Sequence, residues 1–255
     1  IVAGLDRAVG DELRAGTSDA KFTAFEAFVA FVSSPAAKFL CDLISKRPGF
    51  SAHLYVGIDQ KATSKEALET LLGGPVNTKI FFTTSNPIYH PKIYIFVGPS
   101  DARIILGSSN LTITGLFTNV ESSVRVDFTR GDVDGEALLK QIHDFFMPIT
   151  SAATNVQVLS QTVIDALHVH GLVPTETSRA VNQGESKSTA SGHSPRVIHA
   201  LFPPRPSAPM PISRGKKKAG KGKSAPKSTT PNATVPSAPS PSGRDFWIET
   251  GPLTG

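Results

Sequence analysis

The sequence predicts an α/β sandwich built around a mixed and largely buried β-sheet. Short apolar runs with the length of strands alternate with amphipathic segments of helical length in the first half of the chain. Helix start and stop signals separate the two kinds of segment, as expected when helices connect the strands. Because several strands are near-continuous apolar runs, both faces of the sheet should be covered.

Six strands are expected in the folded part. By periodicity the segment 22–32 could equally be a helix, and we interpret it as a strand because a helix start signal follows directly. Its aromatic residues should belong to the core. The expected strands cover residues 25–32, 52–57, 79–83, 92–97, 103–106 and 121–128.

Capping residues set the expected helices. Ser34 with Pro35 predicts the N-cap and first position of a helix over 36–46. Ser64 should cap a second helix. That second helix should end at Leu72, before Gly73 and Gly74. A third helix should begin at Asp132 or Asp134, run to Phe146 and stop near Pro148. A fourth is expected over 156–168.

The composition of the chain changes near Leu172. Residues 1–172 carry 14 Lys+Arg against 17 Asp+Glu, a net charge of −3, and residues 173–255 carry 12 against 4, a net charge of +8. We predict a folded domain over 1–172 and a disordered, basic linker rich in Pro, Ser and Lys over 173–243. Residues 244–255 regain aromatic residues and should begin a truncated C-terminal domain. The chain is therefore expected to be a fragment.

The cysteine content and the absence of long apolar runs indicate the cellular compartment. Its single cysteine, Cys41, fits a buried structural thiol in a reducing compartment. We find no signal-peptide pattern and no apolar run near the ~20 residues that a membrane span requires. We expect a cytoplasmic protein without membrane contact. The positive charge of the tail indicates affinity for a polyanion, without saying which one.

Three short motifs carry the candidate chemistry. His90 and Lys92 are two residues apart where an expected strand begins, and with strand geometry their side chains should project together. The turn from Gly107 to Asn110, with the sequence Gly-Ser-Ser-Asn, offers backbone N–H groups, hydroxyls and an amide as an oxyanion cradle. Glu121 can accept a hydrogen bond from an imidazole N–H and fix its tautomer. A nucleophile or acid beside a fixed cation is what phosphodiester chemistry needs.

These residues resemble the H-x-K … G-S-x-N … E signature of the phospholipase D superfamily, and the resemblance covers most of residues 20–146. Within the superfamily, the sequence is most similar to phospholipase D-like restriction endonucleases, which carry one such motif per chain. Val97 replaces the usual aspartate five residues after the lysine. That loss points to the endonuclease branch and away from the lipases. The resemblance implies a phospholipase D-like α/β/α sandwich, and a DNA-recognition domain beginning within residues 244–255.

The resemblance also implies a role for each residue. His90 would attack the scissile phosphorus and form a phosphohistidine, and His90 of a second subunit would protonate the leaving oxygen and later activate water. Lys92 and Asn110 would hold the non-bridging oxygens with help from Ser108, and Glu121 would orient His90. No metal and no cofactor would be needed, because the two subunits together supply the electrostatic stabilisation.

Partners follow from the same resemblance. Double-stranded DNA is the expected substrate, and a homodimer through the active-site face is the expected assembly. A requirement for a separate ATPase subunit is left open. The basic run of the tail is either a DNA-tracking arm or a solubilising linker, and its members are Lys216, Lys217, Lys218, Lys221 and Lys223.

Other interpretations stay open beside this one. The enzyme could be a nonspecific nuclease or a phospholipid-processing phosphodiesterase. The chain could also be a non-catalytic DNA-binding module with a decayed site, although all four motif positions carry chemically competent residues. His168 and His170 are too few ligands for a metal site. His53 and His143 are expected to fill the core or the surface.

Overall fold

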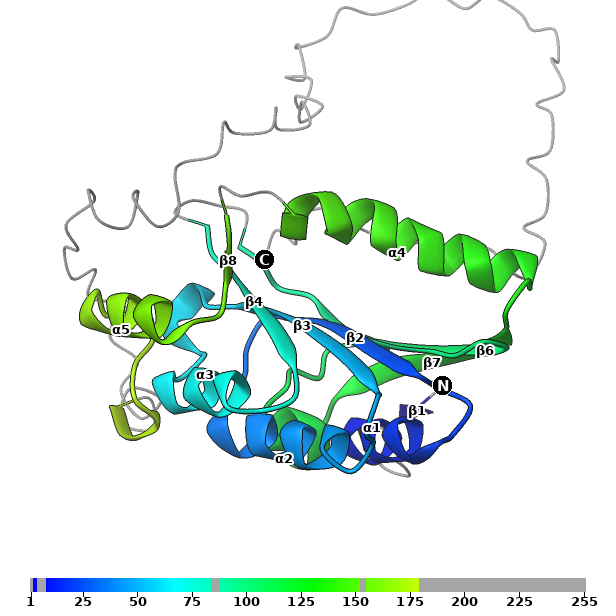
Figure 1. Cartoon of the computed structure of the whole chain (residues 1–255), viewed down its shortest axis with the longest axis horizontal. Helices are drawn as coiled ribbons and strands as arrows, with labels where there is room; N and C mark the ends of the chain where they lie inside the picture. Colours follow the sequence, from blue (N-terminus) through cyan, green and yellow to red (C-terminus); the bar gives the residue numbers. More distant parts are fainter. Residues whose placement is uncertain (1, 4–7, 84–87, 152–154, 179–255) are drawn as a thin grey trace, which may run out of the picture. The chain divides into compact units, whose positions relative to one another are not determined.

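The computed structural model describes residues 2–3, 8–83, 88–151 and 155–178. An eight-stranded sheet has the order β1-β7-β6-β5-β2-β3-β4-β8 (Figure 1). Strands β2, β3 and β4 are parallel and the other neighbouring pairs are antiparallel, so the sheet is mixed, as predicted. The strands are β1 (Val2–Ala3), β2 (Ala24–Val29), β3 (Ser51–Gly57), β4 (Asn77–Phe81), β5 (Lys92–Val97), β6 (Asp101–Gly107), β7 (Ser122–Thr129) and β8 (Val156–Val158).

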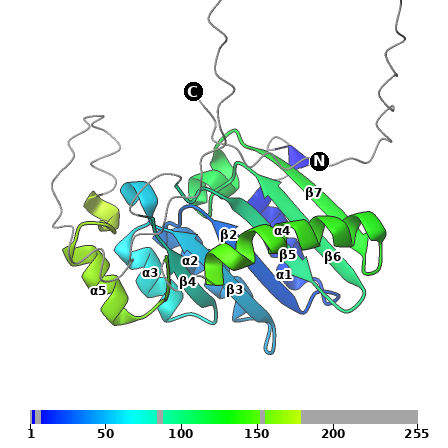
Figure 2. The same cartoon turned by 90° about the horizontal axis from the view of Figure 1, so that it is seen from above.

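Helices cover both faces of the sheet (Figures 1 and 2). Among the described α-helices, α1, α2, α3 and α5 lie on one face and α4 lies on the other. A buried apolar cluster fills each interface, for example around Leu40 and Leu68 on the first face and around Leu138 and Ile142 on the second. The predicted α/β/α sandwich is confirmed. The helices are α1 (Val9–Ser18), α2 (Ser34–Ile44), α3 (Lys65–Leu72), α4 (Val133–Ser151) and α5 (Gln161–Val169).

Within the described ranges, no helix combines the length and the apolar character needed to cross a bilayer.

The helix expected after Ser64 forms as predicted, because the Ser64 hydroxyl accepts a hydrogen bond of 3.2 Å from the Ala67 N–H group. That helix ends at Leu72, with Gly73 as its C-cap. A local sequence signal was sufficient at this position.

The start of α2 differs from the prediction by one residue. Its N-cap is Ser33 instead of Ser34, and the Ser33 hydroxyl accepts a hydrogen bond of 3.4 Å from the Ile113 N–H group. The Ser34 N–H group donates a hydrogen bond of 2.6 Å to a carboxylate oxygen of Glu176. A distant side chain therefore satisfies this helix end, and a cap assigned from local sequence misses it.

Two further predicted helix boundaries were wrong. Helix α4 continues through Pro148 to Ser151, because Phe146 and Ile149 on either side of the proline pack against the second cluster and hold the helix together. A helix was expected over 156–168, but the first residues of this range form the strand β8, which pairs with the edge of β4. Ser160 then caps α5 through a bond of 3.3 Å from the Val163 N–H group.

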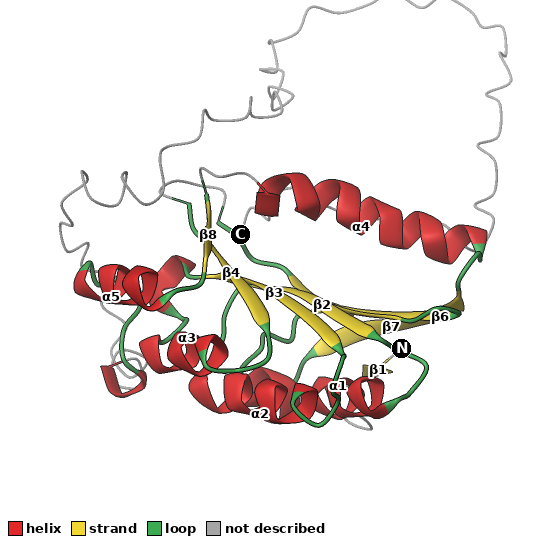
Figure 3. Cartoon of the chain, in the orientation of Figure 1, coloured by secondary structure: helices red, strands yellow, loops and turns green. Residues whose placement is uncertain are grey.

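Figure 3 shows two elements at the N-terminus, α1 and β1, that the sequence analysis did not predict. The described part of the chain also continues past the boundary expected at residue 172. Val173 is fully buried, and the Pro174 carbonyl accepts a hydrogen bond of 2.9 Å from the Lys65 N–H group. The predicted linker beyond residue 178, its basic run and the expected domain start at 244–255 lie outside the described residues.

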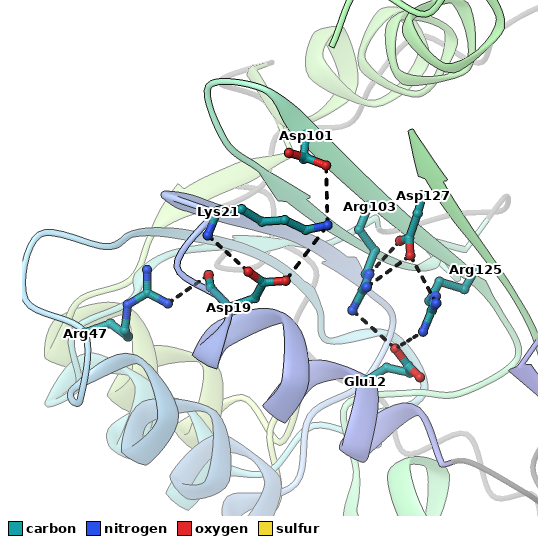
Figure 4. A network of polar contacts seen from close by, with 8 residues as sticks. All are labelled: Glu12, Asp19, Lys21, Arg47, Asp101, Arg103, Arg125 and Asp127. Carbon is teal, nitrogen blue, oxygen red and sulfur yellow. Dashed lines mark hydrogen bonds and ion pairs between the residues drawn. The ribbon is translucent and has the colours of Figure 1, made fainter. Parts of the chain in front are cut away.

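A network of charges attaches α1 to the sheet (Figure 4). Glu12 on α1 is fully buried and pairs with Arg103 on β6 at 3.4 Å and with Arg125 on β7 at 2.9 Å. Arg103 also binds Asp127 at 2.6 Å. Since Glu12 lies between two cations, its loss would leave positive charge facing the apolar side of α1.

Replacing Glu12 by alanine should therefore destabilise the domain by about 3 kcal/mol, the usual cost of breaking a buried pair on one side. Lys38→Ala is the matched control, because Lys38 pairs with Asp42 in an exposed i,i+4 contact at 3.0 Å, which is worth only about 0.5 kcal/mol. Urea denaturation of both variants measures the difference. An equally small loss in both would contradict the structural role given to Glu12.

Candidate active site

The first motif lies where the chain enters β5. His90 and Pro91 precede Lys92, which opens β5 and pairs with Val29 at the carboxyl end of β2. The Pro91 carbonyl accepts a hydrogen bond of 2.8 Å from the Ala30 N–H group. The pairing of the two chain segments thus extends beyond the regular strands and fixes the backbone next to His90.

Lys92 folds back onto His90. Its Nζ atom lies 3.0 Å from the His90 carbonyl oxygen and 3.1 Å from His90 Nε2, and it also contacts His90 Nδ1. His90 is exposed, whereas Lys92 is only 8% exposed. In the part of the chain that the structure describes, no carboxylate forms an ion pair with Lys92. A buried ammonium group without a carboxylate beside an exposed imidazole favours an anionic ligand.

The electrostatics of this pair keep the imidazole neutral. Partial burial, and then the neighbouring Lys92 ammonium, lower the pKa of His90 from its ordinary value. Burial lowers the pKa of Lys92 to about 8, and the negative charge of Glu121 opposes that shift. At neutral pH, a neutral imidazole therefore lies beside a lysine that is still mostly protonated. In this state an imidazole can attack a phosphorus while the cation holds a phosphate oxygen.

The Gly-Ser-Ser-Asn turn follows β6 and lies at the same end of the sheet. A Cβ atom at Gly107 would come within 2.2 Å of the Ser122 carbonyl oxygen, so only glycine fits where the turn passes β7. The buried Tyr94 hydroxyl of β5 donates a hydrogen bond of 2.8 Å to the Ser109 carbonyl. Leu111 then bridges to the chain just after β2. The three motifs thus converge at one end of the sheet.

The turn contains polar atoms that have no hydrogen-bond partner among the described residues. These are the buried Ser109 hydroxyl and the Oδ1 atom of Asn110. Rotation of the Asn110 amide exchanges its acceptor for an N–H donor, which is the group that a phosphate oxygen requires. Unsatisfied buried polar atoms are uncommon in native structures and often mark functional positions.

Glu121 holds the turn in place. It accepts hydrogen bonds from the Ser108 hydroxyl and from Asn119 Nδ2, the latter at 3.0 Å. The Ser122 N–H group in turn donates to the Ser108 hydroxyl at 3.0 Å. The expected hydrogen bond from His90 to Glu121 is not among the contacts of these described residues. Glu121 acts here on the Ser108 turn and electrostatically on Lys92, and its predicted role in orienting His90 remains a prediction.

Two residues beside the site were missed by the sequence analysis. Phe31, expected in the core with its aromatic neighbours, is only partly buried, and its ring lies edge-on to His90 with centroids 5.3 Å apart. The strand end before Ser33 could have indicated this exposure. Asp59 was missed because no local pattern marks it, and it binds the backbone next to His90.

Two further histidines have structural partners. His143 binds Glu26 at 2.7 Å, and His168 Nδ1 lies 2.9 Å from the Val173 carbonyl oxygen. The pKa of His143 is raised, first by the hydrogen bond to Glu26. Among the residues whose positions are described, no three His, Cys, Asp or Glu side chains cluster as metal ligands would.

Comparison with known proteins yields neither a matching family model nor a matching curated sequence. Solved structures do show similarity. A phospholipase D family member, Nuc from Salmonella typhimurium, aligns with 17% identity and a TM-score of 0.40, over 54% of this chain and 86% of that one.

Two larger structures are also similar. Polyphosphate kinase from Porphyromonas gingivalis aligns with 10% identity and a TM-score of 0.41, over 69% of this chain and 25% of that one. Yeast tyrosyl-DNA phosphodiesterase aligns with 13% identity and a TM-score of 0.37, over 56% and 37%. The chain thus spans between a quarter and two fifths of these two proteins.

The protonation state of Lys92 is directly measurable. Because burial disfavours the ammonium form, Lys92 should lose its proton near a pKa of about 8, well below the ~10.4 of an ordinary lysine. A pH titration of the lysine side-chain resonances by NMR tests this, with Lys92→Arg identifying the signal. A midpoint at or above about 10 would mean that the ammonium group is not desolvated.

Proposed function

We propose that this chain is a metal-independent phosphodiesterase that cleaves DNA through a phosphohistidine intermediate. The observation that carries the proposal is the buried Lys92 ammonium, which lies 3.1 Å from Nε2 of the exposed His90 and has no carboxylate partner among the described residues. A phosphodiester supplies both the missing negative charge and an electrophilic phosphorus.

The reaction has two displacement steps. In the first, His90 in its neutral form attacks the phosphorus, the new P–N bond forms, and the bond to the leaving oxygen breaks as that oxygen receives a proton from a second histidine in its protonated form, which the negative charge of the bound phosphate stabilises. In the second, water attacks the phosphorus, its proton passes to the second histidine, and the P–N bond breaks. Lys92 and the Asn110 amide stabilise the negative charge on the non-bridging oxygens in both steps.

One motif per chain supplies only one of the two histidines that this mechanism uses. The second is His90 of the partner subunit in a homodimer that closes over the active-site face, with a two-fold axis through the scissile phosphate. The Ser108 and Asn110 turns of both subunits would then face the same phosphate. A strictly monomeric protein that cleaves DNA at full rate would contradict this arrangement.

DNA is proposed as the substrate in preference to phospholipid. The resemblance of the motifs to phospholipase D-like restriction endonucleases favours DNA, and so does the net charge of +8 over residues 173–255, where 12 Lys+Arg face 4 Asp+Glu. We infer that the described domain is the catalytic part of a restriction endonuclease, with sequence recognition located outside residues 1–178.

Cleavage of plasmid DNA should continue in excess EDTA, because side chains provide the charge stabilisation in this mechanism. Lys92→Met should lower kcat/KM by about a hundredfold or more under the same conditions. Lys140→Met is the control, since Lys140 is 74% exposed on α4, and its rate should stay at the wild-type value.

The same assay distinguishes the substrate classes when phosphatidylcholine vesicles replace the plasmid. If the protein hydrolyses the lipid and leaves the plasmid DNA uncut, the lipid-processing alternative would be favoured. Loss of DNA cleavage in EDTA, restored by Mg²⁺, would rule out the proposed chemistry.

A further inference from the structure

Asp59 is a buried carboxylate that the proposed mechanism does not use. It begins a short 3-10 turn (Asp59–Lys61) directly after β3 and is only 4% exposed. Its Oδ2 atom accepts a hydrogen bond of 2.8 Å from the Tyr89 N–H group, and its Oδ1 atom accepts one of 3.5 Å from the Thr83 N–H group. One side chain therefore binds the backbone at both ends of the segment between β4 and His90.

The backbone around Asp59 is held in an uncommon conformation. Gln60 and Lys61, which follow Asp59, both lie in the left-handed region, with φ values of 58° and 56°. Neither is glycine, so this conformation is unfavourable for both residues and persists only where surrounding contacts impose it. The Asp59 hydrogen bonds are such contacts, because they anchor the turn to the segment that leads to His90.

The residue before His90 is closely surrounded. A Cβ atom at Gly57 would lie 3.2 Å from the Tyr89 carbonyl oxygen and 2.8 Å from the Ala30 carbonyl oxygen, so β3 passes directly beneath this segment. On the other side of His90, Ala30 binds the Pro91 carbonyl at 2.8 Å. Asp59 supplies the corresponding restraint on the upstream side through the Tyr89 N–H group.

We propose that Asp59 is a positioning residue for the His90 nucleophile. By fixing the Tyr89 N–H group, the Asp59 carboxylate sets the backbone direction from which the His90 side chain projects over Lys92. This inference rests on the proposed function, since it assigns the upstream restraint to the nucleophile of that reaction. Asp59 itself touches neither the phosphate nor the reacting atoms.

The variant Asp59→Asn tests the inference, because asparagine keeps the size of the side chain but replaces one acceptor oxygen with an N–H donor. That N–H donor would face one of the two backbone N–H donors, so one of the two hydrogen bonds would be lost. Misplacement of His90 should lower kcat for DNA cleavage by about tenfold to a hundredfold and change KM by no more than about twofold.

The matched control is Ser64→Ala. This change also removes a buried acceptor, because the Ser64 hydroxyl accepts a hydrogen bond of 3.2 Å from the Ala67 N–H group. Ser64 caps α3 and does not contact the segment around His90. This variant should melt at a lower temperature with kcat unchanged. An equal fall in kcat in both variants would show that Asp59 acts only through stability and would overturn the proposal.

Two readouts do not depend on cleavage. The ¹H–¹⁵N resonances of the His90 ring should shift in Asp59→Asn and remain in place in Ser64→Ala, and this comparison holds even if the wild-type protein cleaves no DNA. If Asp59→Asn does not fold, amide hydrogen exchange of the wild type decides. The Tyr89 amide should then be protected as strongly as the amides of β5, and exchange at an unprotected rate would overturn the proposal.

Discussion

The candidate active site depends on a single constraint, the burial of Lys92 at the entry to β5. Lys92 is only 8% exposed, so its ammonium group loses hydration and must regain stabilisation from its surroundings. The described chain provides the His90 carbonyl and ring and the more distant charge of Glu121. A phosphate oxygen would complete this incomplete set. Partial burial, and then the same ammonium group, lower the pKa of His90, so the adjacent imidazole is neutral and ready as a nucleophile.

The sheet keeps this arrangement rigid. β5 lies in the middle of the sheet between β6 and β2, so neighbouring strands fix its position on both sides. The turn after β6 and the residue before β7 arrive at the same end of the sheet, where Glu121 links them through Ser108. The helices contribute indirectly, through two apolar clusters and through the buried Glu12 pair that attaches α1 to β6 and β7. Sites that are built on such packed elements keep their geometry without a bound ligand.

Much of this arrangement was predictable from local sequence patterns. The spacing of two residues predicted that Lys92 lies beside His90, and the two are in contact although His90 precedes β5. The Ser64 cap located α3 to the residue. The predictions that failed depend on contacts between distant parts of the chain. Glu176 satisfies the start of α2 from a part of the chain that was expected to be a linker. Packing around Phe146 carries α4 through a proline.

The same reason explains what was missed at the site. Phe31 belongs to an apolar run that pattern analysis assigns to the core. Because β2 ends at Val29, Phe31 lies beyond the strand, where its ring contacts His90. Asp59 is separated by 30 residues from the N–H group that it binds, so no local spacing could indicate it. Pattern analysis thus found the residues proposed for the chemistry, while the residues that hold them in place became visible only in three dimensions.

The most direct measurement is the location of the covalent intermediate. DNA labelled at the scissile phosphate should be mixed with the protein and quenched in alkali, where phosphohistidine survives, and the labelled peptide should then be mapped. We expect label on the peptide that contains His90, and neither label nor cleavage with His90→Ala. Label on another residue, or cleavage by His90→Ala at a comparable rate, would contradict the central claim.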